Sequence, residues 1–130
     1  MQKDKLLQSV KDVLEQDSGI AFGYIFGSCA HSETAKNSDI DIAIYFYQNF
    51  ERDYFESKLA LYADLSRKLK MNQIDLVILN TCKNLILIDD IVRNGEVVLD
   101  KASDLRFEFE LKMQHRAIDF RHQRYKVLGV

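Results

Sequence analysis

Proline is absent from this 130-residue sequence, which has only five glycines and two cysteines. No stretch of about 18 uncharged apolar residues occurs, so a membrane-spanning helix is not expected. The two cysteines, Cys29 and Cys82, lack the spacing of metal ligands and are interpreted as reduced thiols. Acidic and basic side chains are mixed in residues 1–4, and no signal peptide is expected there. These absences predict a cytoplasmic protein.

The composition is that of one folded domain. Apolar residues make up 47% of the chain, enough to bury a core, and the formal net charge of −2 favours no class of partner. We expect a single domain over residues 1–130, with a core over about 1–100 and a C-terminal helix over about 102–128.

Hydrophobic periodicity predicts alternating helices and strands. The expected helices are 3–16, 50–70, 84–93 and about 102–128, and the expected strands are 20–26, 39–45, 74–79 and 96–99. The first of these strands is apolar on both faces, which is typical of a central strand. Short connections between the segments predict an α/β fold in which helices cover a small mixed β-sheet.

Two aspartates lie in the strand expected over residues 39–45. Asp39 and Asp41 alternate with isoleucines, so both carboxylates project from one face. Aspartate is depleted in strands, and like charges side by side repel. Two carboxylates in this arrangement can hold a pair of metal ions about 3.5–4 Å apart, and hard oxygen ligands favour Mg²⁺ or Mn²⁺ over zinc. The alternative is an edge strand with a solvated acidic face.

Three further residues are candidates for the same site. Gly27 permits a tight turn after the first strand, and Ser28 suits a helix N-cap, where free N–H groups favour phosphate. The alternative is an ordinary strand-to-helix turn. Asp75 is the lone charge of an apolar run and is a candidate third ligand or general base. It can also be read as an ordinary residue at the start of an edge strand.

Gly27-Ser28, ten intervening residues, Asp39-x-Asp41 and the later Asp75 together resemble the nucleotidyltransferase superfamily that includes DNA polymerase beta. The short length and the segment Ile-Asp-Leu-Val-Ile-Leu over 74–79 resemble its minimal members (MNT), the MntA-type antitoxins. Those proteins are usually encoded beside a HEPN-domain ribonuclease toxin. The resemblance implies a polymerase beta-like fold and a HEPN toxin as partner.

The resemblance also implies an activity: Mg²⁺-dependent transfer of AMP from ATP to a hydroxyl, expected to be a tyrosine, of the partner toxin. It implies that Asp39 and Asp41 hold two Mg²⁺ ions, that Gly27 and Ser28 hold the phosphates, and that Asp75 ligates metal and orients the acceptor proton. The chain has little length outside its expected core, so recognition of the acceptor is expected from the last helix, a second copy or a partner. Direct binding of nucleic acid is not expected.

Two alternative functions, from other functional classes, stay open. One is a nucleotidyltransferase for small, aminoglycoside-like molecules, working as a dimer with a shared pocket. The other is an antitoxin that silences its partner by binding alone. The presence of all three aspartates argues against the second, because drift would be expected to lose carboxylates that have no function.

Two of the expected helices carry apolar stripes. In 50–70 the stripe should face the core, and it consists of Phe55, Leu59, Tyr62, Leu65 and Leu69. The last helix has one arc of Leu105, Phe109, Met113, Ala117 and Phe120, and nearly opposite it a second arc of Phe107, Leu111, Ile118 and Tyr125. A helix buries one arc against its own sheet, so we predict that the second arc is a protein interface. The alternative is that this helix lies between layers.

The last helix is also basic. Residues 112–126 carry a net charge of +4, from Lys112, Arg116, Arg121, Arg124 and Lys126 against Asp119. Such a run is usually a solvated face, and the alternative is an electrostatic dock for an acidic partner or RNA. His115 and His122 have no matching carboxylate or cysteine spacing and are interpreted as surface residues rather than metal ligands.

Overall fold

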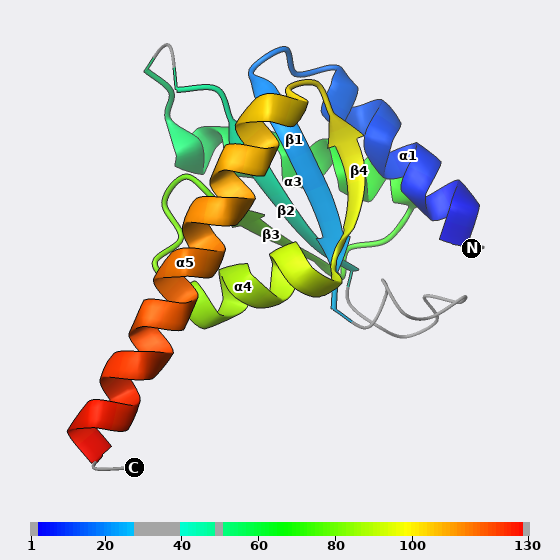
Figure 1. Cartoon of the computed structure of the whole chain (residues 1–130). Coiled ribbons are helices and arrows are strands. Elements are labelled where there is room, and N and C mark those ends of the chain that lie inside the picture. The colour runs from blue at the N-terminus through cyan, green and yellow to red at the C-terminus, as the bar shows by residue number, and fades with distance from the viewer. Residues whose placement is uncertain (1–2, 28–39, 49–50, 129–130) are drawn as a thin grey trace.

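The computed structural model describes residues 3–27, 40–48 and 51–128, with side chains up to residue 123. Helices and strands alternate along these residues much as the periodicity predicts (Figure 1). Their order is α1 (Lys3–Glu15), β1 (Ile20–Phe26), β2 (Ile40–Phe46), α3 (Tyr54–Leu69), β3 (Ile74–Ile78), α4 (Leu85–Asn94), β4 (Glu96–Asp100) and α5 (Ser103–Leu128). The helix expected from residue 50 begins at Tyr54, because the Asp53 side chain accepts a hydrogen bond from the Glu56 N–H and caps it.

The described strands form one mixed sheet in the order β3-β2-β1-β4. β1 is antiparallel to both of its neighbours, and β2 runs parallel to β3. All seven residues of β1 are buried, which confirms the prediction that this strand is central. The α/β fold with a small mixed sheet is therefore confirmed.

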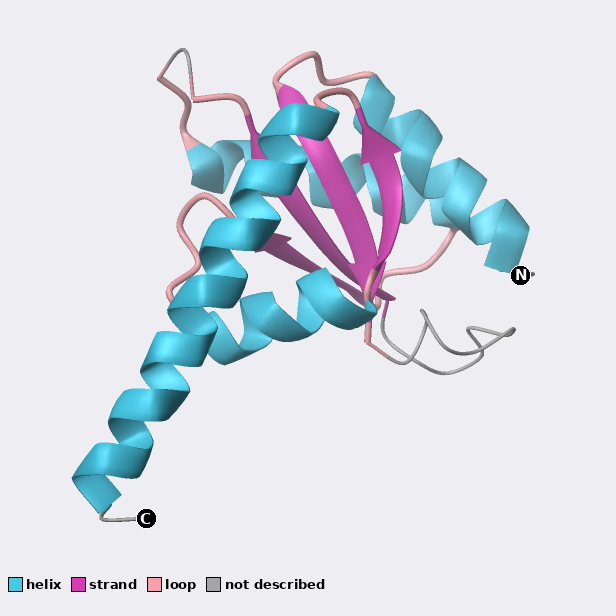
Figure 2. Cartoon of the chain, viewed as in Figure 1, coloured by secondary structure: helices cyan, strands magenta, loops and turns pink. Residues whose placement is uncertain are grey.

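Helices cover both faces of this sheet (Figure 2). Ile40, Ile42 and Ile44 of β2 pack into a core cluster with residues of α1 and α3. The alternate residues Ala43 and Tyr45 belong to a second cluster with residues of α4 and α5. Side chains alternate across a strand, so the odd-numbered residues of β2 face α4 and α5.

The apolar stripe predicted for the helix over 50–70 is wrong in part. Leu65 and Leu69 are buried as expected, but Phe55 and Leu59 are 69% and 54% exposed. The buried face of α3 includes Leu61 instead. The apolar arc of this helix is wider than the face that meets α1 and the sheet, and its Phe55 edge extends into solvent.

The two arcs of α5 separate as predicted. Phe109, Met113 and Ala117 are buried, and the first two belong to the cluster that includes residues of β1, β2 and α4. Phe107, Leu111 and Ile118 are all more than half exposed, and the side chain of the fourth member of that arc, Tyr125, lies outside the described residues. Phe120, on the first arc, is 39% exposed, so the burial of this arc ends before Phe120. Figure 1 shows the C-terminal part of α5 extending away from the sheet.

Polar contacts fix α5 to the rest of the molecule. Asp89 of α4 is almost completely buried and accepts hydrogen bonds from Arg93 and Arg121, each at 2.9 Å. Near the start of α5, the Tyr24 hydroxyl donates to Glu110 at 2.7 Å. Burial, with this bond to a carboxylate, raises the pKa of Tyr24 far above its usual value, so its hydroxyl keeps its proton. The described helices include none long and apolar enough to cross a membrane.

Candidate active site

The sheet brings two of the predicted carboxylates together. In the parallel pair of β2 and β3, Asp41 is the direct partner of Asp75. They precede Ala43 and Val77 by two residues, so both lie on the face of α4 and α5. Neighbouring strands are about 4.7–4.9 Å apart, which places two like charges side by side. This arrangement is costly unless something positive lies between the carboxylates.

Access differs between the two aspartates. Asp41 is half-buried in an interior strand, whereas Asp75 is exposed on β3, which forms one edge of the described sheet. Asp75 can therefore lie on an edge strand and still serve as a metal ligand, so the two interpretations of this residue are compatible. Asp75 can be reached by a group arriving from solvent, and Asp41 supplies a carboxylate fixed by the sheet.

Gly27 makes room for one carboxylate of this pair, that of Asp41. It follows Phe26, the β1 partner of Asp41, and has a φ of 75°, in the left-handed region that glycine adopts without cost. A Cβ at this position would overlap the Oδ2 of Asp41. The backbone conformation therefore favours glycine, and any side chain here would have to displace the carboxylate of Asp41.

Gly27→Ala is expected to destabilise the protein by about 2–4 kcal/mol, because left-handed strain and the overlap with Asp41 add. Urea unfolding measures the loss. In an Asp41→Ala background the overlap is gone, and the same substitution should cost only the strain, about 1–2 kcal/mol. An equal loss in both backgrounds would contradict the contact with Asp41.

The remaining predicted site residues, Ser28 and Asp39, lie outside the described residues, as does the phosphate-binding helix start expected after Gly27. Within the described ranges no group of three potential metal ligands is present, so Asp41 and Asp75 stand there as a pair. The pair offers only carboxylate oxygens, which fit Mg²⁺.

Hydrogen bonds at both ends keep β2 and β3 in register. The Ile40 N–H donates to the Gln73 carbonyl at 2.9 Å, and the Leu79 N–H donates to the Ile44 carbonyl at 2.8 Å. The Asn80 side chain both accepts from the Phe46 N–H and donates to the Phe46 carbonyl, at 2.9 Å each. Sequence reasoning missed Asn80, whose signal was a polar amide directly after an apolar strand. It positions the strands that carry the carboxylates.

Comparison with known proteins gives a family model and several solved structures. The family model described as "Polymerase beta, Nucleotidyltransferase" matches residues 8–104. No match was found among curated proteins. Among solved structures, a chain of the tri-AMPylated Shewanella oneidensis HEPN toxin in complex with MNT antitoxin is 18% identical, with a TM-score of 0.73 and coverage of 98% of this chain and 96% of that one.

Two further structures have the same fold. A toxin–antitoxin structure with AMP-PNP is 21% identical, with a TM-score of 0.75 and coverage of 95% of each chain. The toxin–antitoxin MntA-HepT is 19% identical, with a TM-score of 0.72 and coverage of 97% of this chain and 96% of that one. These likenesses extend over nearly the whole chain, whereas the family match ends at residue 104, in the first turn of α5.

Proposed function

The chain belongs to the polymerase beta nucleotidyltransferase family, and from this premise we propose that it transfers AMP from ATP to a hydroxyl of a partner protein and acts as an antitoxin. The observation that carries the proposal is the in-register pairing of Asp41 with Asp75 beside Gly27. The proposed partner is a HEPN-domain toxin, and the proposed acceptor is a tyrosine. Two structures of the same fold support these choices, one with a tri-AMPylated HEPN toxin and one with AMP-PNP.

Mg²⁺ is the proposed cofactor, as two ions held by Asp39, Asp41 and Asp75. When bound, the ions neutralise charge on the phosphates of ATP and on the transferred group. A cation between Asp41 and Asp75 would also relieve the repulsion that their register imposes.

The transfer itself exchanges one phosphorus–oxygen bond for another. The acceptor oxygen bonds to the α-phosphorus of ATP, the bond from that phosphorus to the bridging oxygen breaks, and pyrophosphate leaves. The acceptor loses its proton, and the carboxylate of Asp75, which is exposed, is proposed to accept or orient it. Gly27 and Ser28 are proposed to bind the β- and γ-phosphates. Fixing the two reactants in line and stabilising the developing charge together supply most of the acceleration in such reactions.

A protein is favoured as acceptor because the site opens at an edge of the sheet and α5 exposes apolar side chains. A docked protein positions its own hydroxyl, so the chain needs no second domain to enclose the acceptor.

Intact-mass analysis of the HEPN-domain protein co-produced with this chain tests the proposal. The HEPN protein is expected to gain one or more AMP units with the wild type and none when produced alone. A HEPN protein that is silenced without any gain in mass would contradict the transfer and support an antitoxin that acts by binding alone.

A further inference from the structure

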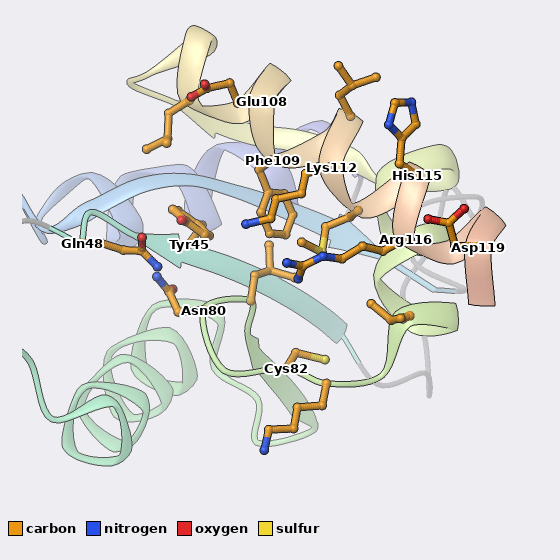
Figure 3. A pocket seen from close by; sticks show the side chains of 16 residues that line it. Tyr45, Gln48, Asn80, Cys82, Glu108, Phe109, Lys112, His115, Arg116 and Asp119 are labelled. Atoms are coloured by element: carbon orange, nitrogen blue, oxygen red, sulfur yellow. The ribbon is translucent and has the colours of Figure 1, made fainter.

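A large hollow lies far from the carboxylate pair, between α5 and the loop that follows β3 (Figure 3). Its volume is about 900 Å³. Leu79, Phe109 and Met113 contribute apolar surface to it, and Tyr45 lines it from β2. Tyr45 lies four residues beyond Asp41 on the same face, which is about 13 Å along a strand. The hollow and the candidate active site are therefore separate places on one side of the sheet.

Two cations of α5 reach into this hollow. Figure 3 shows the side chains of Lys112 and Arg116 extending from the helix over the hollow. They are four residues apart, so they are neighbours on the helix surface, and like charges at this spacing destabilise a helix. Both are exposed, and the fold gains nothing evident from placing them together.

Arg116 differs from the other arginines of the described structure. Arg52, Arg67, Arg93, Arg106 and Arg121 each form an ion pair with an aspartate or glutamate. Among the residues described here, neither Arg116 nor Lys112 has such a partner, although Glu108 and Asp119 also line the hollow. The hollow therefore offers two cationic groups that remain available to an anion.

Apolar side chains lie beside these cations. Leu111 lines the hollow while being 57% exposed, and Phe107 and Ile118 continue its arc along α5. At 100° per residue, Lys112 and Arg116 lie between this exposed arc and the buried arc of Phe109 and Met113. An apolar rim next to paired cations suits a peptide segment better than a free phosphate or an RNA backbone, because neither of those buries apolar surface.

We propose that this hollow binds an acidic segment of the partner protein, with a carboxylate on Arg116 and Lys112 and an apolar side chain on Leu111. Arginine binds carboxylates through two parallel hydrogen bonds, which fixes the orientation of the bound segment. The proposal rests on the proposed function in one respect: the bound protein is the one that carries the acceptor hydroxyl. Docking at the hollow leaves the carboxylate pair free for that hydroxyl.

The test is charge reversal of both cations, Lys112→Glu with Arg116→Glu, read as affinity for the HEPN-domain protein at about 0.15 M salt. Affinity is expected to fall by about 100-fold, the effect of losing two charge-assisted hydrogen bonds. The control is Lys58→Glu with Lys68→Glu on the exposed surface of α3, which makes the same change in net charge. It should stay within about twofold of the wild type. An unchanged affinity for the first variant, or an equal loss in both, overturns the proposal.

Salt and RNA provide independent readouts. Wild-type association should weaken steeply as NaCl rises, and the Lys112→Glu and Arg116→Glu variant should lose most of that dependence. A fluorescent poly(U) probe serves as the alternative ligand. If the wild type binds poly(U) and the double variant loses only that binding while keeping its affinity for the HEPN protein, the hollow is a nucleic-acid site and the proposal fails.

The docking proposal and the proposed function can fail separately. With the two carboxylates intact, the charge-reversed variant should still transfer AMP at saturating partner, with a raised KM and little change in kcat. If the wild type never modifies the partner although the hollow is required for binding, the proposed function fails and the docking stands. If transfer proceeds in the charge-reversed variant with an unchanged KM, the docking fails and the function stands.

Discussion

Asp75→Ala is expected to lower the rate of AMP transfer by about 10³-fold and to leave affinity for the partner within about twofold of the wild type. The expected loss is large because the substitution removes one of the two paired carboxylates, and with it the group that we propose takes the acceptor proton. The fold should persist, since Asp75 is exposed at an edge of the described sheet and the change also removes a like-charge contact with Asp41. Intact-mass analysis over time, beside calorimetric binding, separates the two effects.

The matched control for Asp75 is Asp4→Ala, which removes an exposed aspartate from the first turn of α1. It should leave both transfer and binding unchanged. If Asp75→Ala transfers AMP as fast as the Asp4→Ala control, then Asp75 is an ordinary solvated residue of an edge strand. If it loses binding as well as transfer, the carboxylate contributes to partner contact and not to catalysis alone.

The second large effect is expected at the exposed arc of α5. Leu111→Asp with Ile118→Asp should weaken association with the HEPN-domain protein by about 10³-fold, because two apolar contacts are lost and two charges must be buried in their place. Solubility and the thermal midpoint should be retained, since both side chains are more than half exposed in the isolated chain. Analytical ultracentrifugation of the mixture and a thermal melt of the variant measure the two quantities.

The control comes from α3, which exposes a comparable apolar pair. Phe55→Asp with Leu59→Asp adds the same charge at side chains that are 69% and 54% exposed. This control should bind the partner like the wild type. If it loses association to the same degree, the interface is not confined to α5. If the α5 variant unfolds instead, its arc is part of the core and the interface prediction is wrong.

Local patterns predicted the elements and the faces of this molecule. Alternation of Ile40, Ile42 and Ile44 with Asp39, Asp41 and Ala43 was enough to predict that the carboxylate of Asp41 lies on the opposite face from the isoleucines, as it does. The roles of Asp39 and Ser28 stay predictions, because these residues lie outside the described structure.

Relations between distant segments could not be predicted in the same way. Which strands are neighbours, and in which register, decides that Asp75 stands opposite Asp41, and no local pattern encodes this. Likewise Arg121 is paired because α4 places Asp89 beside it, 32 residues away, whereas Arg116 on the same helix has no such neighbour in the described structure. The prediction that Phe55 and Leu59 of α3 face the core was wrong for a related reason. A helical wheel locates an apolar arc but does not show which part of that arc a neighbouring layer covers.

The parallel register of β2 and β3 places Asp75 opposite Asp41, and the same register buries the apolar residues of β3. Core packing therefore also fixes the relative position of the two carboxylates. A slip of β3 by one residue would bring Ile74 or Leu76 opposite Asp41. The same slip would turn Leu76 and Ile78 out of the cluster beneath the sheet. A chain with a misplaced Asp75 would therefore also have a mispacked core, so the error would appear as lost stability rather than as a folded but faulty enzyme.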